Sequence, residues 1–282
     1  MSETLIDHGT FYEGPRWHEG RWWVSDFYRH VVLSFAPDGT DGREELAVPG
    51  QPSGLGWAPD GSLLVVSMTD CRLLRRRLDG GIDEVASFGE HCGGNANDMV
   101  VDAHGRAYIG NFGFDMAAGE PPVTTNLVRV DPDGSVSVAA RDLAFPNGTV
   151  ITADGSTLIV GETMGGRYTA FAIDPDGSLG DRRVWAELPG VFPDGCALDA
   201  DGHIWCADAG GRRCLLVAEG GDVLADVAAP EGFAVFACML GGPDGRTLLQ
   251  CCAPGLSPDD RIANQDARLV VTTVEVARAG LP

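Results

Sequence analysis

Short apolar runs recur along the chain, and most of them come in pairs that flank a tight turn. Examples are "PSGLGWAPDGSLLVVS" and "PNGTVITADGSTLIVGE". Each pair predicts two antiparallel strands joined by a hairpin, because Gly supplies the positive φ that such turns need. The turn glycines are spaced 41 to 50 residues apart, so the pattern is an internal repeat. They are Gly20, Gly61, Gly105, Gly155, Gly202 and Gly245.

Further hairpin signals lie between the copies, such as "RVDPDGS" and "AIDPDGS", and raise the count to about four strands per copy. Helical periodicity is essentially absent. Six copies of four antiparallel strands predict an all-β fold, a six-bladed β-propeller. An array of β-sandwiches is the structural rival, but six copies in 282 residues are too compact for it. "SETLID" and "ARLVVTTVEVA", from the two ends of the chain, are expected to complete one blade, so that residues 1–282 form a single domain.

The chain is strongly acidic, with a formal net charge of −21. Such a surface repels phosphate backbones and anionic lipids, which makes nucleic acid and membranes poor partners. The start "MSETLIDHGT" lacks the basic and apolar segments of a secretory signal, and no run of 18 apolar residues occurs. We therefore expect a cytoplasmic protein that is a monomer or a weak homo-oligomer.

The eight cysteines show no C-x-x-C spacing, and several lie in apolar, strand-like runs. This usage favours reduced, mostly buried thiols over disulfides or a zinc site. Cys92, in the loop-like "GEHCGGNAND", is the thiol expected to face a pocket.

One polar position changes its chemistry from copy to copy. It lies eight residues before each turn glycine, or seven in the shorter first copy, and in a propeller it would begin the innermost strand at one mouth of the channel. Its occupants are Glu13, Ser53, Asn97, Asn147, Asp194 and Ala237. Four of the six carry a carboxylate or carboxamide oxygen.

Two carboxylates held close together repel each other unless a cation lies between them. Oxygen ligands without His or Cys suit one divalent cation, Ca²⁺ first, with Mg²⁺, Mn²⁺, Zn²⁺ or Fe²⁺ as alternatives. The rival interpretation is that Asn and Asp before Gly simply make good turns. Glu13 is not a turn residue, and four oxygen donors share one register, so a metal site is favoured.

Four motifs carry a resemblance that covers essentially the whole chain: "YEGPRW", "NANDMVVDAHGRAYIGNFG", "FPNGTVITADGSTLIVGET" and "FPDGCALDADGHIWCAD". They closely resemble the SMP-30/gluconolactonase/luciferin-regenerating enzyme family. The resemblance implies a six-bladed propeller with one catalytic divalent ion, held by Glu13, Asn147 and Asp194. It also implies that Asn97 binds substrate or completes the metal shell, and that Asp194 is the acid/base.

These residues predict a metal-dependent hydrolase that opens a lactone or small ester. The substrate carbonyl would bind the ion, Asp194 would take a proton from water, and Asn97 would orient the substrate. The sequence contains no G-x-S-x-G motif, so a serine hydrolase is not indicated. Two alternatives stay open: a phosphotriesterase or organofluorophosphatase-like hydrolase, and a non-catalytic calcium-binding propeller.

The natural substrate does not follow from the sequence. Members of the family that act on sugar lactones often carry Arg where this chain has Asn95, and their Gly-Thr-Met sequence is here "GNFGF". The segment 111–126 is expected to be a long loop between strands, apolar enough to cover a substrate. The residues expected to contact substrate are Asn97, Asn95, Asn111, Phe112 and His91.

Overall fold

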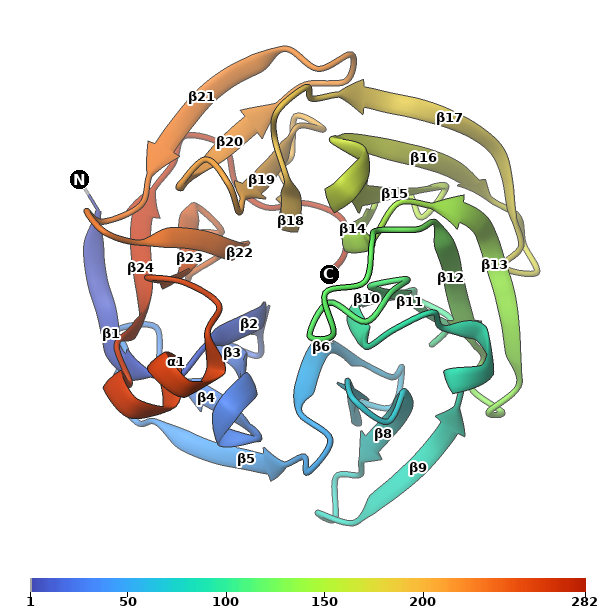
Figure 1. The fold of residues 1–282 in the computed structure, drawn as a ribbon, viewed down its shortest axis with the longest axis horizontal. Helices are drawn as coiled ribbons and strands as arrows, with labels where there is room; N and C mark the ends of the chain where they lie inside the picture. Colours follow the sequence, from blue (N-terminus) through green and yellow to red (C-terminus); the bar gives the residue numbers. More distant parts are fainter. Residues whose placement is uncertain (1) are drawn as a thin grey trace.

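Six four-stranded antiparallel sheets surround a common axis in the computed structural model, which describes residues 2–282 (Figure 1). The predicted six-bladed β-propeller is confirmed. The innermost strands are β2 (Tyr12–His18), β6 (Pro52–Trp57), β10 (Ala96–Val101), β14 (Pro146–Ile151), β18 (Pro193–Leu198) and β22 (Ala234–Gly241). The second strands are β3 (Arg21–Asp26), β7 (Leu63–Ser67), β11 (Ala107–Asn111), β15 (Thr157–Glu162), β19 (Ile204–Asp208) and β23 (Thr247–Ala253).

The two outer strands of each blade follow in the same antiparallel order. The third strands are β4 (Val31–Phe35), β8 (Arg72–Arg76), β12 (Thr125–Val130), β16 (Arg167–Ile173), β20 (Arg213–Val217) and β24 (Ala267–Thr273). The outermost strands are β5 (Arg43–Ala47), β9 (Ile82–Ser87), β13 (Val136–Leu143), β17 (Leu179–Glu187), β21 (Val223–Ala228) and β1 (Glu3–Gly9).

The sixth blade closes the ring with strands from both ends of the chain. Its order is β22-β23-β24-β1, and β1 pairs antiparallel with β24, with Glu3 opposite Val271 and Gly9 opposite Ala267. This closure was predicted. Joining the two ends in one sheet leaves no gap in the ring and ties the first blade to the last.

Apolar side chains fill the spaces between neighbouring blades. Trp22 is fully buried where the first and sixth blades meet, and Trp17 packs edge-on against it at 4.7 Å between ring centroids. Gly241 of the sixth blade makes room for this pair, because a Cβ there would lie 2.6 Å from the Trp22 ring. An aromatic side chain buried in this way stabilises the fold by about 2–3 kcal/mol.

Within residues 2–282, helical segments are confined to the connections. Three are single 3₁₀ turns, η1 (Phe27–Arg29), η2 (Gly89–His91) and η3 (Thr163–Gly165), and one is an α-helix, α1 (Pro258–Asn264). The sequence pattern did not predict α1, although its signals are present. Ser257 accepts from the backbone N–H of Asp260 at 3.4 Å as the N-cap, and Pro258 occupies the first turn.

The C-terminal residues 274–282 cross one end of the channel. Six backbone hydrogen bonds tie them to three blades, including Arg278 to Gly245, Ala279 to Leu198, and a reciprocal pair between Leu281 and Ile151. Figure 1 shows the C-terminus at the centre of the ring. This tail therefore closes the end of the channel at which the first and second strands of each blade are joined by their Asp-Gly hairpins.

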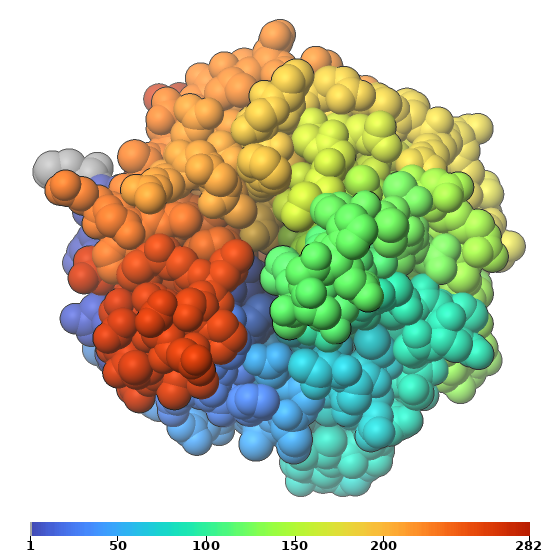
Figure 2. Space-filling view, viewed as in Figure 1, coloured from blue at the N-terminus to red at the C-terminus, as the bar shows by residue number. Residues whose placement is uncertain are grey.

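The opposite end, hereafter the mouth, is where the innermost strands begin. It is bordered by the connections from second to third strand and from each blade to the next. Figure 2 shows that this face is hollowed near its centre, between the green segment after β11 and the red segment that contains α1. Among residues 2–282, no helix combines the length and apolar character that a membrane span requires.

Candidate functional site at the channel mouth

A β-bulge near the start of each innermost strand shapes the mouth. In five blades the bulge directly follows or includes the position singled out in the sequence, and an extra residue of this kind redirects neighbouring side chains. The register shifts lie between Glu13 and Arg16, Pro52 and Leu55, Ala96 and Met99, Pro146 and Thr149, and Pro193 and Cys196. In the sixth blade the bulge lies between Val235 and Ala237 and encloses the buried Phe236, so this blade offers no side-chain oxygen.

The position that holds Glu13, Asn147 and Asp194 in different blades is called the ligand position below. A glycine directly after it lets neighbouring innermost strands approach closely. A Cβ on Gly148 would lie 2.3 Å from the backbone oxygen of Asp194, and a Cβ on Gly195 would lie 2.5 Å from the Cβ of Ala237. Any side chain at these positions would push the strands apart. The repeated Asn-Gly and Asp-Gly pairs therefore bring the starts of adjacent blades together.

Glu13 and Asp194 are both half-buried at the mouth, and the carboxylate of Asp194 acts electrostatically on Glu13. Burial raises the pKa of Asp194 to about 8, and the charge of Asp98 adds to the shift. Burial also raises the pKa of Glu13 well above its usual range, and the charges of Asp194 and Asp98 raise it further. The Gly14 N–H, 3.2 Å from Glu13 Oε2, and Arg16 oppose that shift only in part. The site therefore holds more negative charge than its own cations balance.

Thr163 fixes the orientation of the Asn147 carboxamide. Its hydroxyl donates to the carbonyl oxygen of Pro193 at 2.6 Å, so its Oγ1 can only accept from Asn147, whose Nδ2 lies at 3.1 Å. The nitrogen end of the amide is thereby assigned, and the oxygen Oδ1 points away from Thr163. An oriented carboxamide oxygen is what a cation site requires.

Asn97 is buried beside Ser53, whose hydroxyl donates to Asn97 Oδ1 at 3.5 Å. The next residue, Asp98, occupies the position that is glycine in four other blades: Gly14, Gly54, Gly148 and Gly195. The third blade thus contributes two polar side chains in succession.

Arg16 is buried beneath the mouth and joins three blades. Its guanidinium donates to Asp98 Oδ1 at 2.6 Å, to the Met99 carbonyl at 2.7 Å and to the Leu55 carbonyl at 2.9 Å. The repeat pattern does not distinguish Arg16 or Asp98, although both stand inside the quoted motifs. Because Arg16 is engaged by Asp98, it does not neutralise the Glu13–Asp194 pair.

Two half-buried aromatic side chains border these polar residues. Tyr28 lies close enough to Glu13 for that carboxylate to raise its pKa, after the larger effect of burial. Phe112 follows β11 directly, and its N–H donates to the Asn95 carbonyl at 2.9 Å. Asn95 is half-buried at the mouth, and within residues 2–282 its side chain forms no hydrogen bond.

Asn111 does not reach the mouth with a free polar atom, contrary to the expected substrate contact. It is fully buried, its Nδ2 donates to the Asn126 carbonyl, and its Oδ1 accepts from Gly93 N–H, Gly113 N–H and the Thr125 hydroxyl. The equivalent residues at the ends of other second strands also accept from backbone amides; Glu162, for example, accepts from Ala144 N–H. Asn111 therefore holds a connection in place.

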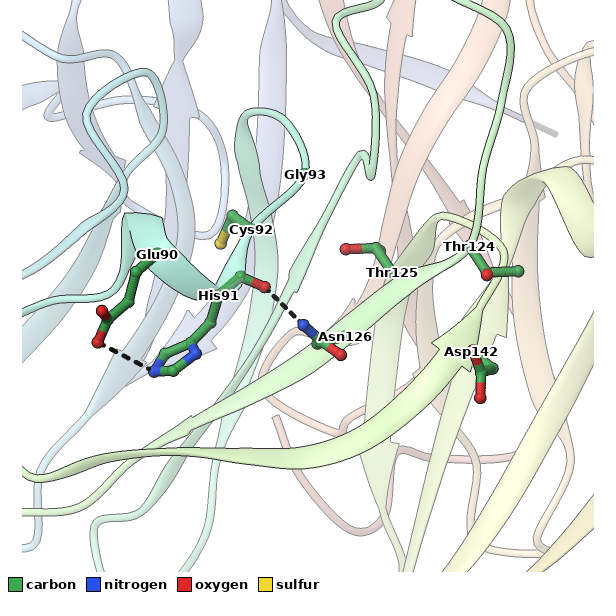
Figure 3. A pocket seen from close by; sticks show the side chains of 8 residues that line it. All are labelled: Glu90, His91, Cys92, Gly93, Thr124, Thr125, Asn126 and Asp142. Atoms are coloured by element: carbon green, nitrogen blue, oxygen red, sulfur yellow. Dashed lines mark hydrogen bonds and ion pairs between the residues drawn. The ribbon is translucent and has the colours of Figure 1, made fainter.

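His91 lies outside the channel. It lines a pocket with Cys92, Asn126 and Asp142, on the side of the third blade where β12 begins and β13 ends (Figure 3). His91 is 3.5 Å from the Glu90 carboxylate, and its backbone carbonyl accepts from Asn126 Nδ2. This position agrees with a pocket-facing Cys92, but because the pocket reaches the outer strands it does not support a His91 contact at the mouth.

All eight cysteines are free thiols, and Cys92 is the one that is not buried. No cluster of three His, Cys, Asp or Glu side chains able to hold a metal ion occurs in the described part of the chain. A cation at the mouth would consequently need carboxamide oxygens beside the two carboxylates.

A family model described as "SMP-30/Gluconolactonase/LRE-like region" matches residues 11–251, which is most of the chain. The protein belongs to this family. Among its relatives, a pentonolactonase of Haloferax volcanii is 28% identical over 279 residues, which cover 96% of this chain and 92% of the relative. A 6-deoxy-6-sulfogluconolactonase of Pseudomonas putida is 28% identical over 210 residues, covering 72% and 69%.

Solved structures agree with the fold. A luciferin-regenerating enzyme superimposes with a TM-score of 0.83 at 21% identity, covering 99% of this chain and 98% of that one. A gluconolactonase of Xanthomonas campestris superimposes with a TM-score of 0.76 at 24% identity, covering 100% and 89%. At these identities the superpositions establish the shared six-bladed architecture.

Proposed function

We propose that this protein is a divalent-metal-dependent hydrolase that opens a lactone or a small ester. The observation that carries the proposal is the uncompensated acidity of Glu13 and Asp194 at the mouth: burial raises both pKa values, and the charge of Asp194 raises that of Glu13 further. Arg16, the cation that acts on Glu13, is held by Asp98. The names of the relatives, a pentonolactonase and a sulfogluconolactonase among them, support the reaction class.

The donor set fits a hard divalent cation. Glu13 and Asp194 would supply charge and Asn147 a neutral oxygen already turned away from Thr163, while Asn97 would complete the shell or face the substrate. Three or four oxygen ligands from separate strands suit Ca²⁺, and Mg²⁺ or Mn²⁺ would also be accepted. When bound, such an ion polarises a carbonyl oxygen and makes bound water more acidic.

The protein's own residues divide the remaining work. The Asp194 carboxylate takes a proton from the attacking water and later returns one to the ring oxygen that leaves. Asn97, buried beside Ser53, hydrogen-bonds to the substrate and orients it. Arg16 and Asp98 support the innermost strands from below and keep Glu13 and Asp194 at their positions.

The test is hydrolysis of γ- and δ-lactones, followed by acid release in a pH-stat. The protein is first treated with EDTA and then supplied separately with Ca²⁺, Mg²⁺, Mn²⁺, Zn²⁺ or Fe²⁺, and bound metal is counted by elemental analysis. We expect one ion per chain and activity only after metal is restored. Lactone hydrolysis that persists in the metal-free protein would contradict the proposal.

Variants make the test specific to the site. Glu13→Gln and Asp194→Asn should each lower kcat/KM at least a thousandfold and weaken metal binding. The matched control is Asp208→Asn, which changes a buried carboxylate of the same blade that accepts from Phe192 N–H at 3.2 Å. An amide oxygen can accept the same hydrogen bond, so this variant should keep its metal and its activity.

Two other outcomes identify the alternatives. Metal-dependent hydrolysis of a phosphotriester or a P–F bond, with no lactone turned over, would assign the protein to phosphorus ester chemistry. Tight Ca²⁺ binding without hydrolysis of either class would assign it as a non-catalytic calcium-binding propeller.

A further inference from the structure

The polar residues of the mouth are bordered by a rim that is apolar in part. Two residues before each ligand position, the chain holds Phe11, Phe145 and Phe192 in the first, fourth and fifth blades. Gln51 and Asn95 hold the equivalent positions in the second and third blades. The rim is therefore apolar on one side of the mouth and polar on the other.

Buried phenylalanines support two aromatic faces that remain partly exposed. Phe112 stacks on Phe145 with ring centroids 4.5 Å apart and planes at 18°, and Phe114 packs against the same Phe145 ring at 5.9 Å. On the other side of the mouth, Tyr28 packs against Phe11 at 5.8 Å. Phe112 and Tyr28 are half-buried, whereas the rings behind them are almost fully buried. Each exposed ring thus has a packed support.

The Tyr28 hydroxyl is already satisfied, because it donates to the Leu256 carbonyl at 2.9 Å. The part of Tyr28 left to meet a ligand is its ring. Phe145 has a φ of 62°, a backbone conformation that a bulky side chain rarely adopts. Such strain concentrates at functional sites, and here it places the ring that supports Phe112.

Exposed apolar side chains also gather on this face. Six of the large hydrophobic residues with substantial exposure lie in the connections that border the mouth: Met116, Val123, Met164, Phe192, Leu256 and Ile262. Figure 2 shows the hollow between the two segments that carry four of them, the green one after β11 and the red one around α1. A ligand that enters the hollow comes between these two segments.

Cationic groups that could bind a hydroxy acid or an anion are largely taken up by carboxylates. Arg29 donates to Glu44 at 2.5 Å, Arg167 donates to Glu162 at 2.8 Å, and Arg261 is paired with Asp266. The chain contains no lysine. Hydroxyl groups pressed against Phe112 or Tyr28 would lose their hydrogen bonds to water without replacement, which is unfavourable.

We infer, on the basis of the proposed lactonase function, that the preferred substrates are lactones with an alkyl or aryl substituent on the ring, which Phe112 and Tyr28 bind. The lactone carbonyl lies toward Glu13 and Asp194, and the substituent lies along the two aromatic faces. Burial of each further methylene group should raise kcat/KM about three- to fourfold until the apolar surface is filled.

A homologous series tests this inference in the metal-loaded protein: γ-butyrolactone, γ-hexalactone, γ-octalactone and γ-decalactone, with γ-phenyl-γ-butyrolactone and glucono-δ-lactone beside them. We expect kcat/KM to rise at least thirtyfold from γ-butyrolactone to γ-decalactone, and the phenyl compound to exceed the sugar lactone. A flat series, or a preference for the sugar lactone, would overturn the inference and leave the proposed lactonase function intact.

Substitutions locate the effect. Phe112→Ala should lower kcat/KM at least tenfold for γ-decalactone and less than twofold for γ-butyrolactone, while Phe112→Leu, which keeps the core packing, should retain an intermediate preference. Tyr28→Ala should act like Phe112→Ala, and Tyr28→Phe should keep the preference because the ring remains. Leu78→Ala, at an exposed apolar residue of a far hairpin, is the control and should change neither value.

Binding separates this inference from the proposed function. If no lactone is hydrolysed, ligand-observed NMR with γ-decalactone and gluconate is carried out on the metal-loaded protein and on Phe112→Ala. Binding of the decalactone that Phe112→Ala weakens at least tenfold would keep the apolar site and reject the lactonase. Absence of decalactone binding would reject both.

Discussion

The same dipeptide, Asp-Gly, stands at both ends of the channel and behaves in opposite ways. At the far end, Asp154 is exposed and accepts from the Thr152 hydroxyl at 2.7 Å and from Ser156 N–H at 3.0 Å, and these hydrogen bonds lower its pKa to about 2. At the mouth, burial raises the pKa of Asp194 to about 8. The residue type is identical, so its surroundings decide which carboxylate can take part in proton transfer.

The far-end hairpins repeat the behaviour of Asp154. Hydrogen bonds within their own turns lower the pKa values of Asp38, Asp60, Asp133 and Asp176. A carboxylate satisfied by its own turn does not need a ligand. At the mouth, the few donors to Glu13 and Asp194 do not offset the effect of burial on their pKa values. This difference between the two ends marks the mouth as the place where an external cation would be stabilising.

The largest expected effect concerns the ion pair beneath the mouth. Arg16→Met should lower the free energy of unfolding by about 3–5 kcal/mol, because it leaves Asp98 buried without its cation. Urea denaturation measures this change. The variant Arg16→Met/Asp98→Asn should recover part of the loss, since no unpaired charge remains.

The far end offers the matched pair. Arg106 pairs with Asp102, which also accepts from the N–H groups of His104 and Arg106, both at 2.9 Å. Arg106→Met should therefore be milder, about 1–2 kcal/mol. Equal losses at the two ends would contradict the view that local backbone donors protect the far end.

The next effect concerns the tail that closes the far end. Removal of residues 274–282 deletes six backbone hydrogen bonds to three blades and should lower the free energy of unfolding by about 2–3 kcal/mol, after the entropy of the freed tail is subtracted. Thermal unfolding measures the change. Activity per folded molecule at low temperature should persist, because the tail lies opposite the mouth; loss of metal binding would show that the two ends are coupled.

A pH titration of stability then compares Asp194 with Asp154 directly. The folded pKa of Asp194, about 8, lies above its unfolded value near 3.8, so its contribution to stability is greatest below pH 4 and is lost as the pH rises toward 8. In chelator, Asp194→Asn should be more stable than the unchanged protein by about 2 kcal/mol at pH 8.5 and nearly equal at pH 4.5. Asp154→Asn should show no such gain at pH 8.5, and a gain in both variants would remove the contrast.

The smallest expected effect concerns Thr163. Thr163→Val keeps the shape but removes the hydroxyl that orients Asn147, and should weaken metal affinity about tenfold, as measured by calorimetry. Thr163→Ser retains the hydroxyl and should restore most of the affinity. Unchanged affinity in the valine variant would mean that Thr163 acts only through packing.

Much of the fold could be read from the sequence because the repeat is local. The hairpin glycines set the strand pairs, and their spacing placed Glu13, Asn97, Asn147 and Asp194 in one register. Asn111 was misjudged because its position at a strand end looks the same whether its side chain meets a ligand or a backbone amide. The helix α1 was missed because a seven-residue segment is too short for a periodic pattern to emerge.

The sequence by itself determined the six blades, the shared position of the oxygen-bearing side chains and the joining of both chain ends in one blade, since each depends on short-range periodicity and strand pairing. Only the tertiary structure decided that Arg16 crosses to Asp98, that Thr163 of the fourth blade orients Asn147 by donating to Pro193 of the fifth, and that residues 274–282 close the far end. These contacts join segments that are distant along the chain. Their geometry exists only once the ring has closed, because burial and neighbouring blades, rather than local sequence, set the partners and the charge of each group.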